Sequence, residues 1–461
     1  MIAEKMNIDD NRAYPIKGKN VVVVGMGATG VSVCKFLCER GAIVSATDVK
    51  RKDEIEDSEA LEKMGVRFST GKIDGNLLST QDLAIVSPGV TLELPEIKEA
   101  RRSGVTVIRD IELASWFLTK PIVAIAGTNG KSTVTTLIGE MLRQSGKEVF
   151  VGGNIGTPAV EGVRCDDEVD AHVLELSSFH LEAVERFNPK IGVLLNITED
   201  HMDRYDSFSD YASTKFKLFM NQSHSDIAVV NAGDPVITED MGEVKGKVIP
   251  FSTKCFIEEG LYLNDEGNIV FDLDGVMEIY PSEGAYLKGL QNTENIMASN
   301  AVARSMGVAQ DSILKVLESF KGLPHRMECV REVDGVSFIN DSKATNAGAV
   351  IKALCGITSL VVLIAGGRDK GGEIGELKET IGRKVKCVVA IGEAGKRFKD
   401  EFSDVTEVIN AGTMEDAVRK AKEMAKKGDV VLLSPACASF DMFNNFEERG
   451  NEFKRVVQEL K

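Results

Sequence analysis

Apolar residues along this chain occur in short runs, and a turn of glycine or polar residues follows each run. Runs of four to six residues lie at 21–24, 43–47, 83–86, 122–126, 171–174 and 191–195, and again at 336–339, 360–365, 387–391 and 430–433. Between some of these runs, apolar residues recur with the spacing of a helix, as at 414–427. Continuous apolar runs are typical of strands that are buried on both faces. The pattern therefore predicts an α/β fold with mostly parallel sheets.

The stretch from 226 to 287 has a different pattern. Its strand-like pieces are short and are separated by turns such as the one at 264–267, which predicts a peripheral sheet. Residues 292–308 then predict a helix with polar residues at its start. A chain of 461 residues is long enough for about three domains, and the α/β patterning predicts boundaries near residues 111 and 322.

The best-defined motif covers residues 122–136, which read IVAIAGTNGKSTVTT. An apolar strand leads into a glycine turn at 127–130, and the polar start of a helix follows. Backbone N–H groups of such a turn and the positive end of the helix dipole attract a polyphosphate. Lys131 supplies a cation and Ser132 a hydroxyl ligand for Mg²⁺. Ile125 stands where the phosphate-loop pattern has glycine, and an ordinary strand-to-helix turn is the alternative, but the motif predicts a nucleoside triphosphate site.

A second glycine motif follows the first apolar run, where residues 25–30 read GMGATG. A helix and a second strand come next, and Asp48 ends that strand. This order is the dinucleotide-binding fingerprint. On its own it favours an oxidoreductase that uses NAD or FAD, although the same backbone donors can hold any phosphate-bearing nucleotide. The strand at 83–86 ends in Ser87, Pro88 and Gly89 at the same sheet edge, so a nucleotide site is predicted in the first domain.

Polar residues also follow the strands beside the phosphate loop. The strand at 171–174 leads into Glu175, and the strand at 191–195 leads into a loop with Asp200, His201 and Asp203. Three parallel strands that end in polar residues place those residues around one crevice. Glu175 and His201 are therefore candidates to hold a metal beside the triphosphate, although each could instead be a solvated residue. Mg²⁺ prefers oxygen ligands, so an imidazole can only complement carboxylates and phosphate.

The last α/β stretch likewise has polar strand ends, at 340–346, 366–370 and 434–441. Cys437 lies in the last of these segments and could be read as a nucleophile. His325, at the entrance of the stretch, is its only histidine. A small buried thiol is therefore favoured over a catalytic one.

The charge balance excludes several classes of partner. With 55 basic and 71 acidic side chains the net charge is −16, which argues against a general nucleic-acid surface and for small-molecule ligands. No apolar run approaches the ~18–20 residues of a membrane span, and residues 1–12 are too polar for a signal peptide. The eight cysteines include no Cys-x-x-Cys pair, which argues against a zinc site or a disulfide framework. We expect a cytoplasmic protein.

In chain order, the segments GTNGKST, ELSSFHL, NITEDHMDR, DSKATN and SPACASFDMFNNF resemble the Mur ligases, and the resemblance covers essentially the whole chain. It implies a UDP-sugar-binding Rossmann-like domain at 1–111, a central P-loop-type ATP-binding domain at 112–322 and a C-terminal, amino-acid-binding Rossmann-like domain at 323–461. Within the family the motifs are most similar to those of ligases that add D-glutamate to UDP-N-acetylmuramoyl-L-alanine in peptidoglycan synthesis. That activity uses ATP and Mg²⁺ and proceeds through an acyl phosphate. The resemblance also implies a monomer.

The resemblance assigns roles to individual residues. The UDP-sugar would be held by Ala28, Thr29, Asp48, Ser87, Pro88, Gly89 and Asn154. ATP would be held by Gly127, Thr128, Asn129, Gly130, Lys131, Ser132, Thr133, Asn292, Asn295, Arg326 and Asp341. The Mg²⁺ ligands would be Ser132, Glu175, His201 and a carbamate on Lys215, and the catalytic residues would be Lys131, Glu175, His201 and Lys215. D-glutamate would be held by Lys343, Thr345, Lys370, Ser439 and Phe446. From the residues alone, Lys215 would be an exposed helix lysine.

Two positions depart from the family pattern, because Gln291 stands where histidine is usual and His180 stands where glutamine is usual. Three alternatives stay open: a sister Mur ligase for another amino acid, a non-catalytic nucleotide-sugar-binding protein and a dinucleotide-dependent oxidoreductase. The D-N-P-R motif expected in the diaminopimelate-adding sister is absent. The oxidoreductase alternative leaves the phosphate loop unexplained.

Overall fold

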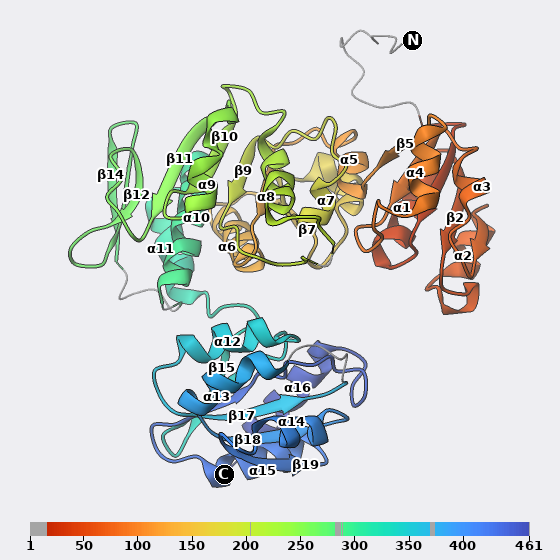
Figure 1. Cartoon of the computed structure of the whole chain (residues 1–461). Helices are drawn as coiled ribbons and strands as arrows, with labels where there is room; N and C mark the ends of the chain where they lie inside the picture. Colours follow the sequence, from red (N-terminus) through yellow and green to blue (C-terminus); the bar gives the residue numbers. More distant parts are fainter. Residues whose placement is uncertain (1–15, 203, 282–286, 288, 369–373, 461) are drawn as a thin grey trace. The chain divides into compact units, whose positions relative to one another are not determined.

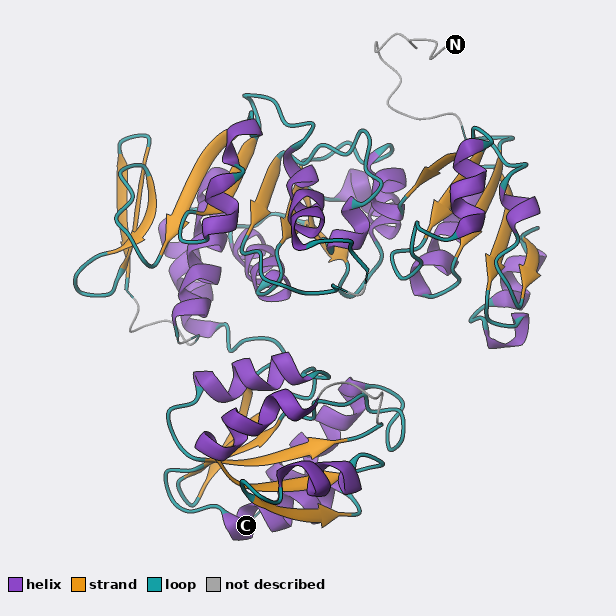
Figure 2. Cartoon of the chain, viewed as in Figure 1, coloured by secondary structure: helices purple, strands orange, loops and turns teal. Residues whose placement is uncertain are grey.

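The computed structural model of the chain describes residues 16–202, 204–281, 287, 289–368 and 374–460. Three β-sheets, each flanked by helices, follow one another along the sequence (Figure 1 and Figure 2). The chain divides after Phe320 into two compact units, with the first two sheets in one unit and the third in the other. The predicted three-domain α/β architecture with mostly parallel sheets is confirmed. Asp203 and Lys370 lie outside the described residues.

The first sheet has five parallel strands in the order β3-β2-β1-β4-β5. The strand order reverses between β1 and β4, and their carboxyl ends therefore flank the position where open α/β sheets bind ligands. The strands are β1 (Asn20–Val24), β2 (Ile43–Asp48), β3 (Arg67–Thr70), β4 (Leu83–Val86) and β5 (Thr106–Ile108), and the helices are α1 (Ala28–Glu39), α2 (Ser58–Lys63), α3 (Gly75–Leu78), α4 (Pro95–Arg102), α5 (Asp110–Ser115) and the 3-10 helix η1 (Lys52–Glu54).

The second sheet has nine strands in the order β14-β13-β12-β11-β10-β9-β6-β8-β7. Its strands are parallel except for the antiparallel pairs β12–β13 and β13–β14. The peripheral strands expected from 226–287 are present, but they form one side of the central sheet and not a sheet of their own, because β11 pairs with β10 and β10 pairs with β9. The strands are β6 (Ile122–Ala126), β7 (Val149–Gly153), β8 (Ala171–Glu175), β9 (Ile191–Leu194), β10 (Ile227–Asn231), β11 (Lys247–Ser252), β12 (Gly260–Leu263), β13 (Ile269–Leu273) and β14 (Val276–Tyr280).

One helix of this part, α8, begins at a polar side chain that caps it. The side chain of Ser207 accepts the Asp210 N–H at the start of α8, as an N-cap residue does. The helices are α6 (Lys131–Gln144), α7 (Ser178–Leu181), α8 (Phe208–Phe216), α9 (Pro235–Glu239), α10 (Leu290–Ser305) and α11 (Gln310–Ser319), with the 3-10 helices η2 (Ala159–Glu168), η3 (Lys217–Phe219) and η4 (Met241–Glu243). In the described part of the chain, no helix combines the length and the apolar character that a membrane crossing needs.

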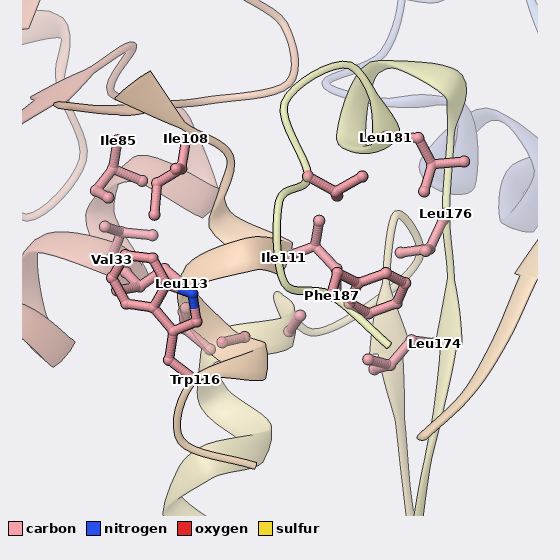
Figure 3. Packing of buried hydrophobic residues seen from close by; sticks show 14 of the residues in the cluster. Val33, Ile85, Ile108, Ile111, Leu113, Trp116, Leu174, Leu176, Leu181 and Phe187 are labelled. Atoms are coloured by element: carbon pink, nitrogen blue, oxygen red, sulfur yellow. The ribbon is translucent and has the colours of Figure 1, made fainter. Parts of the chain in front are cut away.

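The first two sheets share one hydrophobic core. Its residues include Val33, Ile85 and Ile108 from the first sheet and its helix, Ile111, Leu113 and Trp116 from α5 and the turn after it, and Leu174, Leu176, Leu181 and Phe187 from the second sheet and the segments that follow it (Figure 3). Helix α5 directly follows β5 and carries its side chains into this core. The boundary expected near residue 111 therefore falls inside a helix whose side chains contact both sheets.

The third sheet forms the second unit, with strand order β15-β16-β20-β17-β18-β19. Only β15 and β16 pair antiparallel among these strands. Alternate residues of β17 face opposite cores: Leu363 packs with residues of α12 to α14, and Ile364 packs with residues of α15 and α16. The strands are β15 (Glu328–Val333), β16 (Val336–Asn340), β17 (Val361–Gly366), β18 (Val385–Ile391), β19 (Glu407–Ala411) and β20 (Val430–Leu433), and the helices are α12 (Ala347–Gly356), α13 (Lys378–Lys384), α14 (Gly395–Phe402), α15 (Met414–Met424), α16 (Phe446–Glu459) and the 3-10 helix η5 (Ile374–Leu377).

A substitution in the shared core of the first unit should lower the stability of the protein. Phe187 is fully buried, so Phe187→Ala leaves a cavity and should lower the free energy of unfolding by about 3–5 kcal/mol. The matched variant is Phe256→Ala, because Phe256 is 70% exposed and its loss should cost no more than about 1 kcal/mol. Urea unfolding of both variants measures the difference. Equal losses would mean that Phe187 does not contribute to a packed core.

Candidate active site

The turn between β6 and α6 has the backbone geometry of an anion site. Gly127 and Gly130 have positive φ angles of 149° and 85°, which place the turn in a region that favours glycine. No side chain caps the N-terminus of α6, and its first turn contains no acidic residue. The first N–H groups of the helix therefore have no intrahelical acceptor and no competing carboxylate. Ile125 is buried within β6, so the missing glycine of the motif falls in the strand before the turn.

The loop after β9 holds this turn in place. The Asn129 N–H donates to Asn196 Oδ1 at 2.8 Å, and Asn196 Nδ2 donates back to the Asn129 carbonyl at 3.1 Å. The Thr128 and Tyr211 hydroxyls lie 3.0 Å apart in a hydrogen bond. Asn196 and Tyr211 were not among the residues predicted for the site. The position of Asn196 after an apolar strand was a usable signal, whereas nothing in the sequence places Tyr211 against the turn.

Two lysines share one carbonyl of the turn. Lys131 Nζ donates to the carbonyls of Gly127 and Thr128, at 2.9 Å in each case, and Lys215 Nζ donates to the Gly127 carbonyl at 3.0 Å. Lys215 is 1% exposed, so the expectation of an exposed lysine from the residues alone is wrong. Burial first, and then the nearby charge of Lys131, lower the pKa of Lys215 well below its usual value. The environment therefore favours a neutral amine at this position.

Glu175 ends β8 next to β6, where it lies opposite Ile125. Its Oε1 accepts a hydrogen bond from Asn154 Nδ2 at 2.7 Å, whereas its buried Oε2 has no hydrogen-bond partner among the described residues. A buried carboxylate oxygen without a donor is suited to a cation. The geometry therefore brings the predicted UDP-sugar residue Asn154 to the predicted metal residue Glu175.

His201 lies on the loop after β9, with a positive φ of 57°. Its side chain is about half-exposed and its ring centroid lies 4.7 Å from that of Phe179, which belongs to the short helix after β8. Among the residues that the structure describes, no group of three or more His, Cys, Asp or Glu side chains could hold a metal ion. A cation held by Glu175 and His201 would therefore need oxygen donors beyond the side chains that the structure describes.

The glycine-rich turn after β1 is braced by two of the predicted UDP-site residues. The Asp48 carboxylate accepts the N–H groups of Met26 and Lys50, and Ser87 Oγ donates to the Gly25 carbonyl at 2.6 Å. A Cβ on Gly30 would lie only 2.0 Å from that carbonyl oxygen, so glycine is required for the close approach. Ala28 and Thr29 form the first turn of α1, which has no side-chain cap and no acidic residue. This helix start is suited to a phosphate group.

Helix α10 brings its predicted residues to the phosphate loop. Asn295 is buried, and its Nδ2 donates to Asn292 Oδ1 at 3.3 Å. A Cβ on Gly130 would lie 2.3 Å from Asn295 Oδ1, so Asn295 contacts the turn itself.

His180, one of the two residues that depart from the family pattern, is buried with its Nδ1 2.7 Å from Ser177 Oγ. Burial lowers the pKa of His180, which favours its neutral form.

In the second unit, β16, β20 and β17 are neighbours, so their polar ends lie along one sheet edge. The Asp341 carboxylate accepts hydrogen bonds from the Met327 N–H at 3.2 Å and the Ser434 hydroxyl at 2.9 Å. Burial raises the pKa of Asp341 to about 6. Arg326 precedes Met327 and is half-buried.

Near the same edge, Lys343 Nζ lies 5.7 Å from the centroid of the Phe446 ring. Ser439 is buried and Thr345 is exposed. Arg449, which was not among the predicted residues, is buried and donates to Ser342 and to the Cys437 carbonyl.

Family models match the chain in three consecutive segments. Residues 19–109 match the Mur ligase MurD-like N-terminal domain, residues 125–303 the Mur ligase middle domain and residues 325–437 the Mur ligase glutamate ligase domain. The chain is 45% identical over 446 residues to the UDP-N-acetylmuramoylalanine--D-glutamate ligase of Geotalea daltonii, across 96% of this chain and 98% of that protein.

The chain belongs to the Mur ligase family. It is also 44% identical over 444 residues to the protein of the same name from Geobacter sp. strain M21, across 96% of this chain and 98% of that protein. Among solved structures, its fold is similar to that of the UDP-N-acetylmuramate-alanine ligase MurC from Thermotoga maritima, with a TM-score of 0.58 and 19% identity across 96% of this chain and 100% of that chain. The family resemblance stated from the motifs is therefore confirmed.

The turn between β6 and α6, which we call the phosphate turn, allows a test of the need for glycine at position 130. Gly130 and Gly146 have nearly the same φ, 85° and 86°, so alanine introduces similar backbone strain at both positions. A Cβ would meet Asn295 only at Gly130, because nothing lies within 4 Å at Gly146. We expect Gly130→Ala to lower the free energy of unfolding by at least about 1 kcal/mol more than Gly146→Ala, as measured by urea unfolding.

The double variant with Asn295→Ala tests the cause of this difference. Removing the Asn295 side chain opens the space, so the excess cost of Gly130→Ala should largely disappear in that background. An excess cost that persists unchanged would show that the contact with Asn295 is not responsible.

Proposed function

We propose that this chain is the ATP-dependent ligase that joins D-glutamate to UDP-N-acetylmuramoyl-L-alanine in peptidoglycan precursor synthesis. The observation that carries the proposal is the 44–45% identity, over 96% of the chain, to proteins named for that activity. The matched 96% of the chain extends over both units and includes the C-terminal part, where we propose that the amino acid binds. A sister ligase for a different amino acid would be expected to differ most in that part.

The phosphate turn is the proposed ATP site. Backbone N–H groups of residues 127–133 would face the phosphates, with Lys131 as the cation and Ser132 as a hydroxyl ligand of Mg²⁺. Asn295 and Asn292 lie close enough to the turn to act on the same nucleotide. Arg326 and Asp341 would contribute from the second unit.

Glu175, His201 and Lys215 are the proposed metal residues. The unpartnered Oε2 of Glu175 supports this role, and so does the burial of Lys215 beside the turn. A neutral Lys215 amine can attack CO₂, forming an N–C bond and releasing a proton. The resulting carbamate would supply the oxygen donors that the described side chains lack. Mg²⁺, when bound, neutralises charge on the phosphoryl group during transfer.

The UDP-sugar would bind at the glycine-rich turn of the first sheet, on Ala28, Thr29, Asp48, Ser87, Pro88 and Gly89. Asn154 would meet the sugar, and its hydrogen bond to Glu175 supports a sugar position beside the proposed metal residue. D-glutamate would bind on the second unit at Lys343, Thr345, Ser439 and Phe446, with Lys370 outside the described residues. Two lysines suit the two carboxylates of D-glutamate.

The proposed reaction has two covalent steps. The substrate carboxylate attacks the γ-phosphorus of ATP, which forms an acyl phosphate and releases ADP. Lys131 is placed to stabilise the charge that develops on the phosphates. The amine of D-glutamate then attacks the acyl carbon, so that an amide bond forms and phosphate leaves. Because an acyl phosphate hydrolyses readily, water must be excluded between the two steps.

The substrate can be tested directly. The purified protein is incubated with ATP, Mg²⁺, UDP-N-acetylmuramoyl-L-alanine and one amino acid at a time, and phosphate release and product mass are measured. We expect turnover with D-glutamate and a loss of at least on the order of 10²-fold in Lys131→Ala, which lacks the stabilising cation. Turnover with a different amino acid would identify a sister ligase. Nicotinamide or flavin absorbance of the purified protein, without ATP consumption, would instead support the oxidoreductase alternative.

The role of Lys215 has its own test. Lys215→Ala should nearly abolish turnover, and acetate should partly restore it by supplying the missing oxygen donors. The matched variant Lys215→Arg keeps a cation but cannot form a carbamate, so its turnover should stay low. Circular dichroism and urea unfolding control for folding, because a helix tolerates alanine well. Native-like turnover in Lys215→Arg would show that this position acts only as a cation.

A further inference from the structure

Glu182, at the end of α7, lies between two arginines from distant parts of the first unit. Its Oε2 accepts hydrogen bonds from Arg109 Nη2 and, at 2.9 Å, from Arg204 Nη2. Its Oε1 accepts hydrogen bonds from Arg204 Nε at 3.0 Å and from the Tyr205 hydroxyl at 3.2 Å. Arg109 lies just before α5, whereas Arg204 follows His201 by three residues. We call Arg109, Glu182 and Arg204 the Glu182 cluster.

Both arginines of the Glu182 cluster hold the backbone after β4. Arg109 Nη1 donates to the carbonyls of Val86, Ser87 and Val90, at 3.2, 2.7 and 3.0 Å. Arg204 donates to the carbonyls of Pro88 and Val90, at 3.0 and 3.1 Å. The segment 86–90 is thus held by two guanidinium groups that share one carboxylate, and this segment contains the proposed UDP-site residues Ser87, Pro88 and Gly89.

Arg204 also contacts the loop of His201. Its backbone N–H donates to the His201 carbonyl at 2.9 Å. Its guanidinium carbon lies 3.7 Å from the centroid of the Phe179 ring, and the His201 ring centroid lies 4.7 Å from the same ring. A shift of Arg204 would therefore change both the packing of Phe179 and the backbone that carries His201.

The carboxylate is essential to this arrangement because all its acceptor positions face donors. Arg109 has no exposed surface and the side chain of Arg204 is 11% exposed, so neither can exchange Glu182 for water at low cost. A glutamine at this position would keep the shape, but it would turn N–H donors toward a guanidinium. The cluster therefore depends on the charge of Glu182 and not only on its volume.

We propose that Glu182 is a positioning residue that couples the UDP-sugar site to the metal loop: through Arg109 and Arg204 it links segment 86–90 to the loop of His201, so that binding of the UDP-sugar favours binding of the Mg²⁺-nucleotide. The proposal rests on the proposed function, which places the UDP-sugar at segment 86–90 and a metal at His201. Coupling of this kind is reciprocal and appears as a ratio of dissociation constants.

The test measures the dissociation constant of Mg²⁺-ADP by calorimetry, with and without saturating UDP-N-acetylmuramoyl-L-alanine. In the native protein we expect the sugar nucleotide to tighten Mg²⁺-ADP binding about fivefold or more. In Glu182→Gln the ratio should fall below about twofold. Arg204→Lys is a second variant that changes the cluster less, because it keeps the positive charge. A lysine ammonium group cannot contact Glu182 and the carbonyls of Pro88 and Val90 at the same time. Glu161→Gln is the matched control, since Glu161 pairs with Arg164 at the surface of the same unit.

If Glu182 had only a structural role, its substitution would raise the dissociation constant of Mg²⁺-ADP equally with and without the sugar nucleotide. The ratio of the two constants would then stay unchanged. A native ratio near one, or an unchanged ratio in a folded Glu182→Gln or Arg204→Lys variant, would overturn the proposal. These results leave the proposed function intact if the native protein still forms product with D-glutamate. A native protein that binds no UDP-N-acetylmuramoyl-L-alanine and forms no product would overturn the proposed function and this coupling with it.

Discussion

The parallel pairing of β6 between β8 and β9 is the constraint on which the candidate site depends. It fixes Ile125 opposite Glu175 and Ala126 opposite Leu194, so the phosphate turn, the buried carboxylate and the loop of His201 leave the sheet at one edge. The side chain of Asn196 then joins the loop after β9 to the turn after β6. A shift in strand register would separate these groups, because each is placed by its distance from a strand end.

Much of this arrangement could be predicted from the sequence, because apolar strands and glycine turns leave strong local patterns. The strand at 83–86 has the predicted limits, and the helix after the glycine turn begins at Lys131 as predicted. Other features depend on contacts between distant segments, which local patterns do not encode. Lys215 has the sequence context of an exposed helix lysine, yet it is buried against the turn 88 residues before it in the chain.

The place of the peripheral strands depends on distant contacts in the same way. The short strands after residue 226 predict a peripheral sheet, and only the pairing of β11 with β10 shows that they continue the central one. The glycine-rich turn of the first sheet illustrates the reverse case, in which a local pattern fits several ligands. Its backbone donors and the braces at Asp48 and Ser87 suit a phosphate group, and they do not distinguish a dinucleotide from a sugar nucleotide.

The shared core around α5 also bears on how the chain can be divided. A fragment that ends near residue 111 would be cut within α5, before Leu113 and Trp116, and would leave the apolar face of Val33, Ile85 and Ile108 exposed to water. Such a fragment would expose a contiguous apolar surface of the kind that promotes aggregation and attracts proteases. The two sheets of the first unit are therefore not interchangeable modules, although each has a complete α/β topology. Exchange of parts between relatives would preserve folding best at the connection after Phe320.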